Sequence, residues 1–179
     1  AVFYSISNCQ KGLRSVSFGS CLIKQVAEEL KREFAGLRAF VTLSPVPGLA
    51  AWTRAEAARG EDGLLGPAQR AAAAALYAPG SEGEGGEALP EIAALYLAQA
   101  RAPRGGAVDP VARFHLGNGA RLERINPGAD DGARARRASW GLMVNYRYDL
   151  DEIERNHEAY ATEGVVAASA AVRRLAKRR

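Results

Sequence analysis

A turn of small residues that precedes a helical pattern gives the first indication of chemistry in this chain. Residues 14–19 read RSVSFG, and the apolar residues that follow recur at helical spacing. Small residues let a backbone approach a ligand closely, and the unpaired N–H groups at a helix start bind anions with help from the helix dipole. The turn therefore indicates an anion-binding site. The alternative is a small-residue helix entry that holds no ligand.

Ser44 and His115 are the candidates for hydrogen-bonding and proton-transfer chemistry. Ser44 follows an apolar run and precedes Pro45, and proline disfavours helical geometry in the residue before it. We therefore expect Ser44 to be extended and held by a stiff corner at the end of a strand. On residue type alone, such a serine more often bonds to its own turn, and a lone histidine is more often structural than catalytic.

Two apolar runs and a helix between them must position the anion-binding turn and Ser44. Residues 1–6 (AVFYSI) and 38–43 (RAFVTL) are rich in aromatic and β-branched types, as short buried strands are. The helical pattern from residue 19 to residue 34 lies between them. A strand, a helix and a parallel strand form a βαβ unit, and ligands collect at the carboxyl ends of its strands. The turn and Ser44 would both lie there.

Residues 111–124 are predicted to form a β-hairpin that carries His115. Two alternating runs flank the Gly-Asn-Gly sequence at 117–119, whose residues readily adopt the positive φ of tight turns. His115 then lies on the first strand, just before the turn. We interpret His157, which lies in a charged helical context, as structural.

Residues 53–108 are predicted to contribute a helix, a flexible loop and a second helix. An Ala-rich run comes first, and the Gly/Ser/Glu stretch at 79–87 has too little apolar content to order itself. An apolar-periodic segment follows, and Pro90 suits its first turn.

The remaining chain is predicted to contain one strand and a terminal helix. Residues 142–148 form the strand, and Asp149 and Asp151 can cap a helix that follows it. Residues 126–137 are predicted to be a polar loop, and residues 165–179 a helix with a basic end.

Several separated strings resemble the C-terminal catalytic domain of the malonyl-CoA decarboxylase family. In the family's order they are SISNCQKGLRSVSFG, LIKQVAEELKREF, FVTLSPVPGLAAW, DPVARFHLGNGARLERIN and GLMVNYRYDLDEIERNHEAY. The resemblance implies an α/β (α+β) fold with a mixed sheet flanked by helices, like that of the GCN5-related acetyltransferases and present here in part. Residues 1–179 would be the C-terminal part of that catalytic domain, with a helical insertion and flexible loop at 53–108.

The resemblance also implies which residues form the site. Ser44 and His115 match the family's catalytic serine and histidine strings, and Tyr148 aligns with an active-site tyrosine, with Tyr146 as the neighbouring candidate. Residues 14–19 resemble the acetyltransferase pyrophosphate turn Q/RxxGxG/A, although Ser17 replaces the middle glycine. Some family members carry a glutamate at the position of Ser17. Because this chain has a serine there, no role for a carboxylate is expected at this position. The residues expected to bind CoA are Arg14, Ser15, Val16, Ser17, Phe18, Gly19 and Ser20.

The function that the resemblance implies is decarboxylation of malonyl-CoA to acetyl-CoA and CO₂. Loss of CO₂ leaves an enolate whose charge collects on the thioester oxygen, so the site needs donors aimed at that oxygen and a proton source near the carbon. The thioester is itself the electron sink, so we expect no metal and no cofactor beyond the CoA of the substrate. The alternatives are a CoA-dependent N-acyltransferase of the same fold and a non-catalytic CoA-binding module.

Composition and charge restrict the class of protein. A chain of 179 residues suggests one domain, and the net charge of +4 is modest. No run approaches the roughly 18 apolar residues of a membrane span, and no signal-peptide pattern is visible. Cys9 and Cys21 are too few for a disulfide framework or a metal site. The basic residues near the end lack interleaved aromatics. We therefore expect a soluble, cytoplasmic protein that binds malonyl-CoA but neither nucleic acid nor membrane.

The start of the chain predicts a piece of a longer protein. Ala1 opens directly into an apolar strand without an initiator Met. We expect the complete protein to be a homo-oligomer and the 179-residue chain alone to be inactive.

Overall fold

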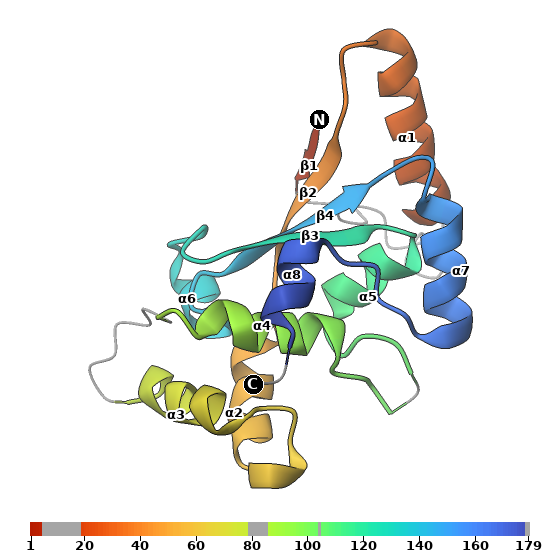
Figure 1. The fold of residues 1–179 in the computed structure, drawn as a ribbon. Coiled ribbons are helices and arrows are strands. Elements are labelled where there is room, and N and C mark those ends of the chain that lie inside the picture. The colour runs from red at the N-terminus through yellow and green to blue at the C-terminus, as the bar shows by residue number, and fades with distance from the viewer. Residues whose placement is uncertain (5–18, 79–85, 104, 178–179) are drawn as a thin grey trace, which may run out of the picture.

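The computed structural model describes residues 1–4, 19–78, 86–103 and 105–177 (Figure 1). Most of the predicted anion-binding turn, at 14–18, lies outside the described residues, as do Cys9 and residues 79–85 of the predicted flexible loop. Among the described helices, none has the length and apolar character needed to cross a membrane.

A four-stranded mixed sheet with the strand order β1-β2-β4-β3 forms the centre of the fold. β1 (Val2–Tyr4) runs parallel to β2 (Phe40–Pro45), with α1 (Gly19–Glu33) between them in sequence. β4 (Met143–Tyr148) is antiparallel both to β2 and to β3 (Arg121–Asn126). The predicted βαβ unit and the predicted mixed α/β sheet flanked by helices are therefore confirmed.

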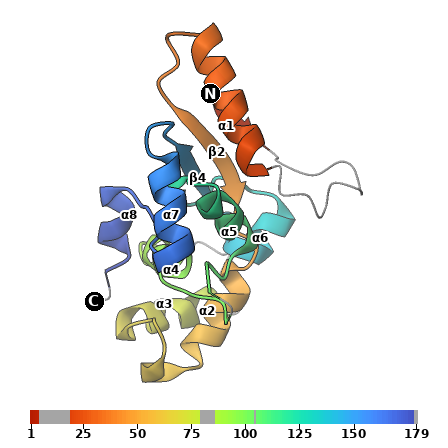
Figure 2. The ribbon, with the colours of Figure 1, turned by 90° about the vertical axis from the view of Figure 1, so that its right-hand side faces the viewer.

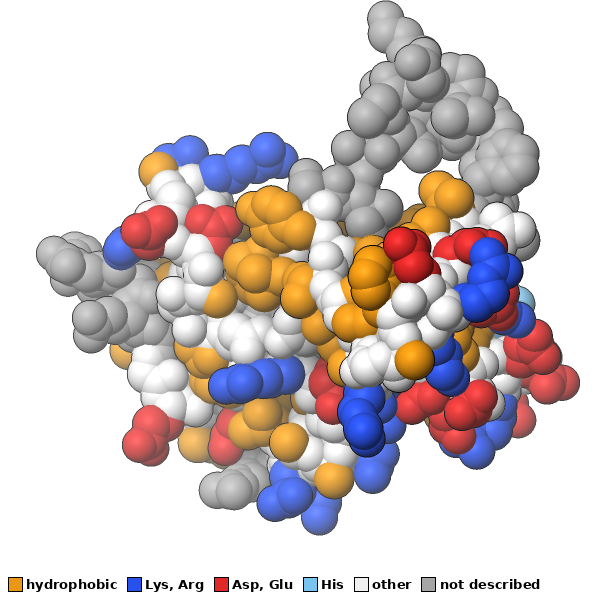
Figure 3. Space-filling model, turned by 90° about the horizontal axis from the view of Figure 1, so that it is seen from above, with side chains coloured by type: hydrophobic (Ala, Val, Ile, Leu, Met, Phe, Trp, Pro, Cys, Tyr) orange, Lys and Arg blue, Asp and Glu red, His pale blue; other side chains and the backbone are white. Residues whose placement is uncertain are grey.

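Large apolar side chains remain exposed on the first two elements of the fold. β1 and α1 lie at the top of Figure 1, and the view from above in Figure 3 shows hydrophobic side chains gathered between charged ones. α1 buries Ile23 and Ala27 on one face, as its amphipathic pattern predicts. The large apolar residues that are exposed on these two elements and just beyond them are Val2, Tyr4, Leu22, Val26 and Phe34.

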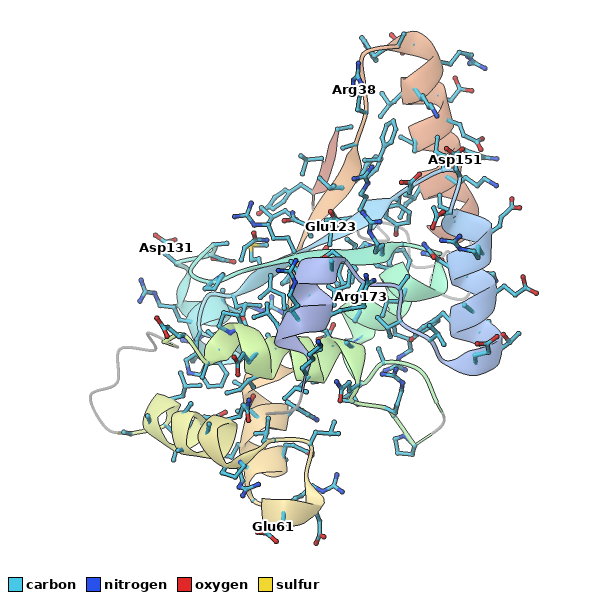
Figure 4. All side chains as sticks on the ribbon, viewed as in Figure 1. Arg38, Glu61, Glu123, Asp131, Asp151 and Arg173 are labelled. Carbon is cyan, nitrogen blue, oxygen red and sulfur yellow. The ribbon has the colours of Figure 1, made fainter. Side chains whose placement is uncertain are left out.

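Helices from the middle of the chain lie on one side of the sheet (Figure 1). They are α2 (Leu49–Ala57), the 3₁₀ turn η2 (Gly60–Asp62), α3 (Pro67–Leu76) and α4 (Leu89–Ala98). α4 packs against β3, and the helices α2 and α3 pack against α4. α4 is buried along nearly its whole length, so it lacks a polar face. Glu61 on η2 lies at the opposite end of the molecule from Arg38 (Figure 4). The sequence predicts α3 and α4, but it does not predict α2.

The segment that carries His115 is a helix, so the predicted hairpin is wrong. α5 (Pro110–Gly117) begins at Asp109, whose Oδ1 accepts hydrogen bonds from Val111 N and Ala112 N, both at 2.9 Å. An aspartate N-cap followed by proline is a favourable helix start, because the carboxylate satisfies unpaired N–H groups and proline has none to satisfy.

The Gly-Asn-Gly sequence ends this helix instead of turning a hairpin. Ala120 N donates to His115 O and Gly119 N donates to Leu116 O, both at 3.0 Å. This is the bond pattern of a Schellman motif, in which the residue after the C-cap is left-handed. Gly119 has a φ of +75°. Positive φ serves helix ends and hairpin turns alike, which is why the sequence pattern was misinterpreted.

Three further predictions need correction near the end of the chain. α6 (Ala133–Ser139) occupies part of the predicted loop at 126–137. α7 (Ile153–Glu163) has no side-chain cap, because Asp149 contributes its backbone carbonyl instead of its carboxylate. The terminal helix α8 (Ala170–Leu175) is shorter than predicted, since residues 167–169 instead hydrogen-bond to Leu122 of β3.

Candidate active site

Ser44 lies inside β2, one residue before the strand ends. It pairs with Val144 of β4, and its side chain shares the buried face of the strand with Phe40 and Thr42. The prediction placed Ser44 just after the strand, so only the strand boundary was wrong. This buried face of the sheet is the one against which α5 packs.

The structure brings Ser44, His115 and Tyr148 together. Ser44 Oγ lies 3.2 Å from His115 Nε2, and Tyr148 Oη lies 2.8 Å from His115 Nδ1. The three side chains are 5%, 3% and 2% exposed, respectively. They come from β2, α5 and β4, so the imidazole bridges two hydroxyls from two neighbouring strands.

Burial favours the uncharged forms of His115 and Tyr148. Removal of the imidazole from water lowers the pKa of His115 to about 4, because a buried cation loses its hydration. Burial also raises the pKa of Tyr148, and the nearby Asn118 side chain opposes this increase in part. At neutral pH the site therefore contains a neutral imidazole and a protonated phenol. A neutral imidazole has one donor nitrogen and one acceptor nitrogen.

Tyr146 contacts His115 by stacking and not through its hydroxyl. The two rings are 4.5 Å apart between centroids, at an interplanar angle of 24°. The Tyr146 hydroxyl is buried and has no hydrogen-bond partner among the residues that the structure describes. Of the two candidate tyrosines, Tyr148 is therefore the one placed to exchange a hydrogen bond with the histidine.

Asp109 connects the helix that carries His115 to the chain that follows Ser44. One carboxylate oxygen caps α5, and the other accepts a hydrogen bond from Tyr96 Oη at 3.3 Å. The backbone of Gly48 lies close enough to lower the pKa of Asp109 in part, but burial is the largest effect and raises this pKa. The role of Asp109 was not predicted from the sequence, although the Asp-Pro pair before an apolar run is a helix-start signal.

The other sequence candidates fall into three groups. His157 Nδ1 lies 2.6 Å from Gly117 O, so this histidine supports the end of α5. Gly19 and Ser20 are the first residues of α1, whose first turn carries no acidic residue. Arg14, Ser15, Val16, Ser17 and Phe18 lie outside the described residues. No group of three or more potential metal ligands occurs in the described part of the chain.

Fold and site together define an α/β domain whose centre is a hydrogen-bonded serine, histidine and tyrosine. The family model of the malonyl-CoA decarboxylase C-terminal domain matches residues 1–179. The mitochondrial malonyl-CoA decarboxylase of Rattus norvegicus is 38% identical over 202 residues, which include 94% of this chain. This chain therefore belongs to the malonyl-CoA decarboxylase family.

Solved structures agree with this assignment. The malonyl-CoA decarboxylase of Rhodopseudomonas palustris is 49% identical with a TM-score of 0.86, and the match covers 97% of this chain. That of Cupriavidus metallidurans is 39% identical with a TM-score of 0.80, also over 97% of this chain. This chain corresponds to 39% of the rat protein and to 41% and 47% of the two bacterial chains. It therefore spans less than half the length of these relatives.

Proposed function

We propose that this chain forms part of an enzyme that decarboxylates malonyl-CoA to acetyl-CoA and CO₂. The observation that carries the proposal is the buried Ser44–His115–Tyr148 arrangement in a chain of this family. The relatives are named for this reaction, and the site contains the uncharged donors that the reaction requires.

The reaction breaks the bond between the carboxylate carbon and the α-carbon of the malonyl group. The electron pair moves into the thioester to form an enolate, CO₂ leaves, and the α-carbon then takes up one proton. Donors that face the enolate oxygen stabilise this charge most strongly where water is excluded. In the proposal His115 is the general acid or oxyanion donor, and Ser44 bonds both to His115 and to the substrate. Tyr148 is the third hydroxyl, for the carboxylate or the oxyanion.

A neutral histidine suits this role at physiological pH. At neutral pH an imidazole with a pKa near 4 is uncharged, so it does not form an ion pair with the substrate carboxylate. One of its nitrogens still donates a hydrogen bond. An imidazolium would instead form an ion pair with the carboxylate and stabilise the ground state, which does not accelerate the chemical step.

We propose that the pyrophosphate of CoA binds the backbone of residues 14–20 at the start of α1. The small residues of this segment and the absence of acid in the first turn of α1 support the site. In the complete protein, Gly19→Val should weaken CoA binding at least tenfold, because a branched side chain blocks the approach of an anion. Gly36→Val is a matched control, since nothing lies within 4 Å of its added Cβ. Equal CoA affinity in both variants would exclude this binding site.

The function is tested with the complete protein and malonyl-CoA, with and without amine acceptors. Release of CO₂ and acetyl-CoA without any acceptor is the expected result. Malonyl transfer to an added amine, with release of free CoA, would instead support an N-acyltransferase of the same fold. Tight CoA binding without turnover of either kind would support a non-catalytic CoA-binding module. Either of these two outcomes would overturn the proposal.

A further inference from the structure

The backbone ladder between β2 and β4 is interrupted beside the candidate active site. Phe40 and Val41 pair with Tyr148 and Arg147, and the pairing resumes between Ser44 and Val144. Thr42 and Leu43, which lie opposite Tyr146 and Asn145, do not continue it. On the other edge of β4 the register with β3 also shifts between Leu122 and Arg124. β4 is therefore irregular on both sides at the level of His115.

Side chains replace the missing ladder bonds. Tyr146 N donates to Thr42 Oγ1 at 3.1 Å, and Asn145 Nδ2 donates to Thr42 O at 2.6 Å. Asn126 Nδ2 in turn donates to Asn145 Oδ1 at 2.8 Å. Buried backbone groups require partners, and here Thr42 and Asn145 supply them. Thr42 is completely buried, so its hydroxyl has a fixed position in the sheet.

This fixed hydroxyl is also a partner of Ser44. Ser44 Oγ donates to Thr42 Oγ1 at 2.8 Å, within the buried face of β2. A threonine hydroxyl has two acceptor positions, and the Tyr146 N–H and the Ser44 O–H fill both. Thr42 Oγ1 therefore holds Ser44 Oγ at a fixed position on the buried face, 3.2 Å from His115 Nε2.

His115 connects this pair of hydroxyls to Tyr148. Its Nε2 lies 3.2 Å from Ser44 Oγ, and its Nδ1 lies 2.8 Å from Tyr148 Oη. A row of hydrogen-bonding groups therefore runs from Tyr148 through His115 and Ser44 to Thr42, and Thr42 anchors this row to the backbone of β4.

We propose that Thr42 is a positioning residue that holds the Ser44 hydroxyl in place beside His115 Nε2. The inference rests on the proposed decarboxylase function, because in that reaction Ser44 bonds both to His115 and to the substrate. Thr42 acts through Ser44 and does not itself touch the substrate. Without the Thr42 hydroxyl, Ser44 Oγ loses the partner that fixes its position in the sheet.

The test uses the complete protein with Thr42→Val, which keeps the shape of the side chain and removes its hydroxyl, and Thr42→Ser, which keeps the hydroxyl. We expect kcat for CO₂ release to fall about tenfold in Thr42→Val with KM within about twofold, since misplaced groups in a site can lose up to about 10² in rate. Thr42→Ser should stay within about threefold of wild type. Thr53→Val is the matched control, because Thr53 is also completely buried and its hydroxyl donates to Leu49 O within α2, away from Ser44.

A second measurement does not depend on turnover. Nitrogen NMR of the histidine-labelled complete protein reports the hydrogen bonding of both ring nitrogens of His115, whose signals are those that vanish in His115→Gln. We expect the Nε2 signal to keep its wild-type position in Thr42→Ser and to shift in Thr42→Val, where Ser44 Oγ is no longer held. In a Ser44→Ala background, Thr42→Val should cause no further loss of rate, because the two residues act as one unit.

Each outcome separates this inference from the proposed function. If the wild-type protein releases no CO₂, the proposed function fails, while the NMR measurement still tests Thr42. If the wild type is active and Thr42→Val keeps both its kcat and the wild-type position of the His115 Nε2 signal, the inference is overturned. Equal losses in Thr42→Val and Thr42→Ser would also overturn it, because packing and not the hydroxyl would then be responsible.

Discussion

Ser44 and His115 are 71 residues apart in the sequence, yet their side chains meet at 3.2 Å on the buried face of the sheet. Asp109 caps the helix that carries His115, and its carboxylate lies beside Gly48, just beyond the strand of Ser44. This buried carboxylate is therefore next to both of the elements that carry the pair.

Loss of either partner should abolish most of the activity. In the complete protein we expect Ser44→Ala and His115→Ala each to lower kcat by roughly 10² or more, as removal of one preorganised donor typically does. KM should change much less. His157→Ala is the control, since this exposed histidine lies outside the site, and it should retain activity within about threefold. Steady-state CO₂ release measures all three, and near-normal turnover in either site variant would remove that residue from the catalytic assignment.

The two tyrosines next to His115 should behave in opposite ways. Tyr148→Phe removes the hydrogen-bond partner of His115 Nδ1, so kcat should fall about tenfold. Tyr146→Phe keeps the stacked ring and removes a buried hydroxyl without a partner in the described part of the chain. It should leave kcat nearly unchanged and leave the melting temperature equal or higher, because an unsatisfied buried polar group costs about 1–3 kcal/mol. A loss of activity in Tyr146→Phe alone would reverse the assignment.

The pKa of His115 predicts how stability depends on pH. It is about 4 in the folded protein and about 6.5 in an unfolded chain. As the pH falls from about 6.5 to 4, the unfolded chain takes up a proton that the folded chain does not. The free energy of unfolding should therefore fall by on the order of 3 kcal/mol from this group and become constant below pH 4.

Denaturant unfolding of wild type and of His115→Gln between pH 4 and pH 7.5 isolates this contribution, because Asp109 and the other groups titrate in both proteins. Parallel pH profiles for the two proteins would show that burial does not perturb the histidine. Above about pH 6.5 the difference between the two profiles should be constant.

Gly48 leaves no room for a side chain because of Tyr96. A Cβ at this position would lie 2.3 Å from Tyr96 Oη, whereas Cζ, the nearest atom of the Tyr96 ring, would be 3.4 Å away. Gly48→Ala should therefore destabilise the protein by about 1–3 kcal/mol, as overpacking does. Tyr96→Phe removes the clashing oxygen, so the double variant should be more stable than the sum of the single effects predicts. Strict additivity in thermal unfolding would contradict this geometry.

The central layer could be predicted from sequence because its patterns are local. The strands around Phe40 and Tyr148 and the helix between the first two strands follow from apolar periodicity and β-branched composition. The site residues came from the resemblance of whole strings, since a lone serine or histidine carries little information by itself.

The missed features depend on information that local pattern does not contain. α5 was missed because glycine and asparagine at positive φ serve two kinds of structure, and the choice depends on the Asp109 cap and on packing against α7, beside which α5 lies in Figure 2. The role of Thr42 depends on a register between two strands about 100 residues apart. No spacing within either strand reveals that register.

The bond from Tyr146 N to Thr42 Oγ1 makes one backbone amide dependent on a side chain. Deuterium exchange at an amide requires that its hydrogen bond open, so the Tyr146 amide should lose protection in Thr42→Val. The amides of the regular β2–β4 pairs, such as that between Phe40 and Tyr148, should keep theirs. The exchange rate of the Tyr146 amide therefore reports whether the Thr42 hydroxyl is held in place in the resting protein, before any substrate is added.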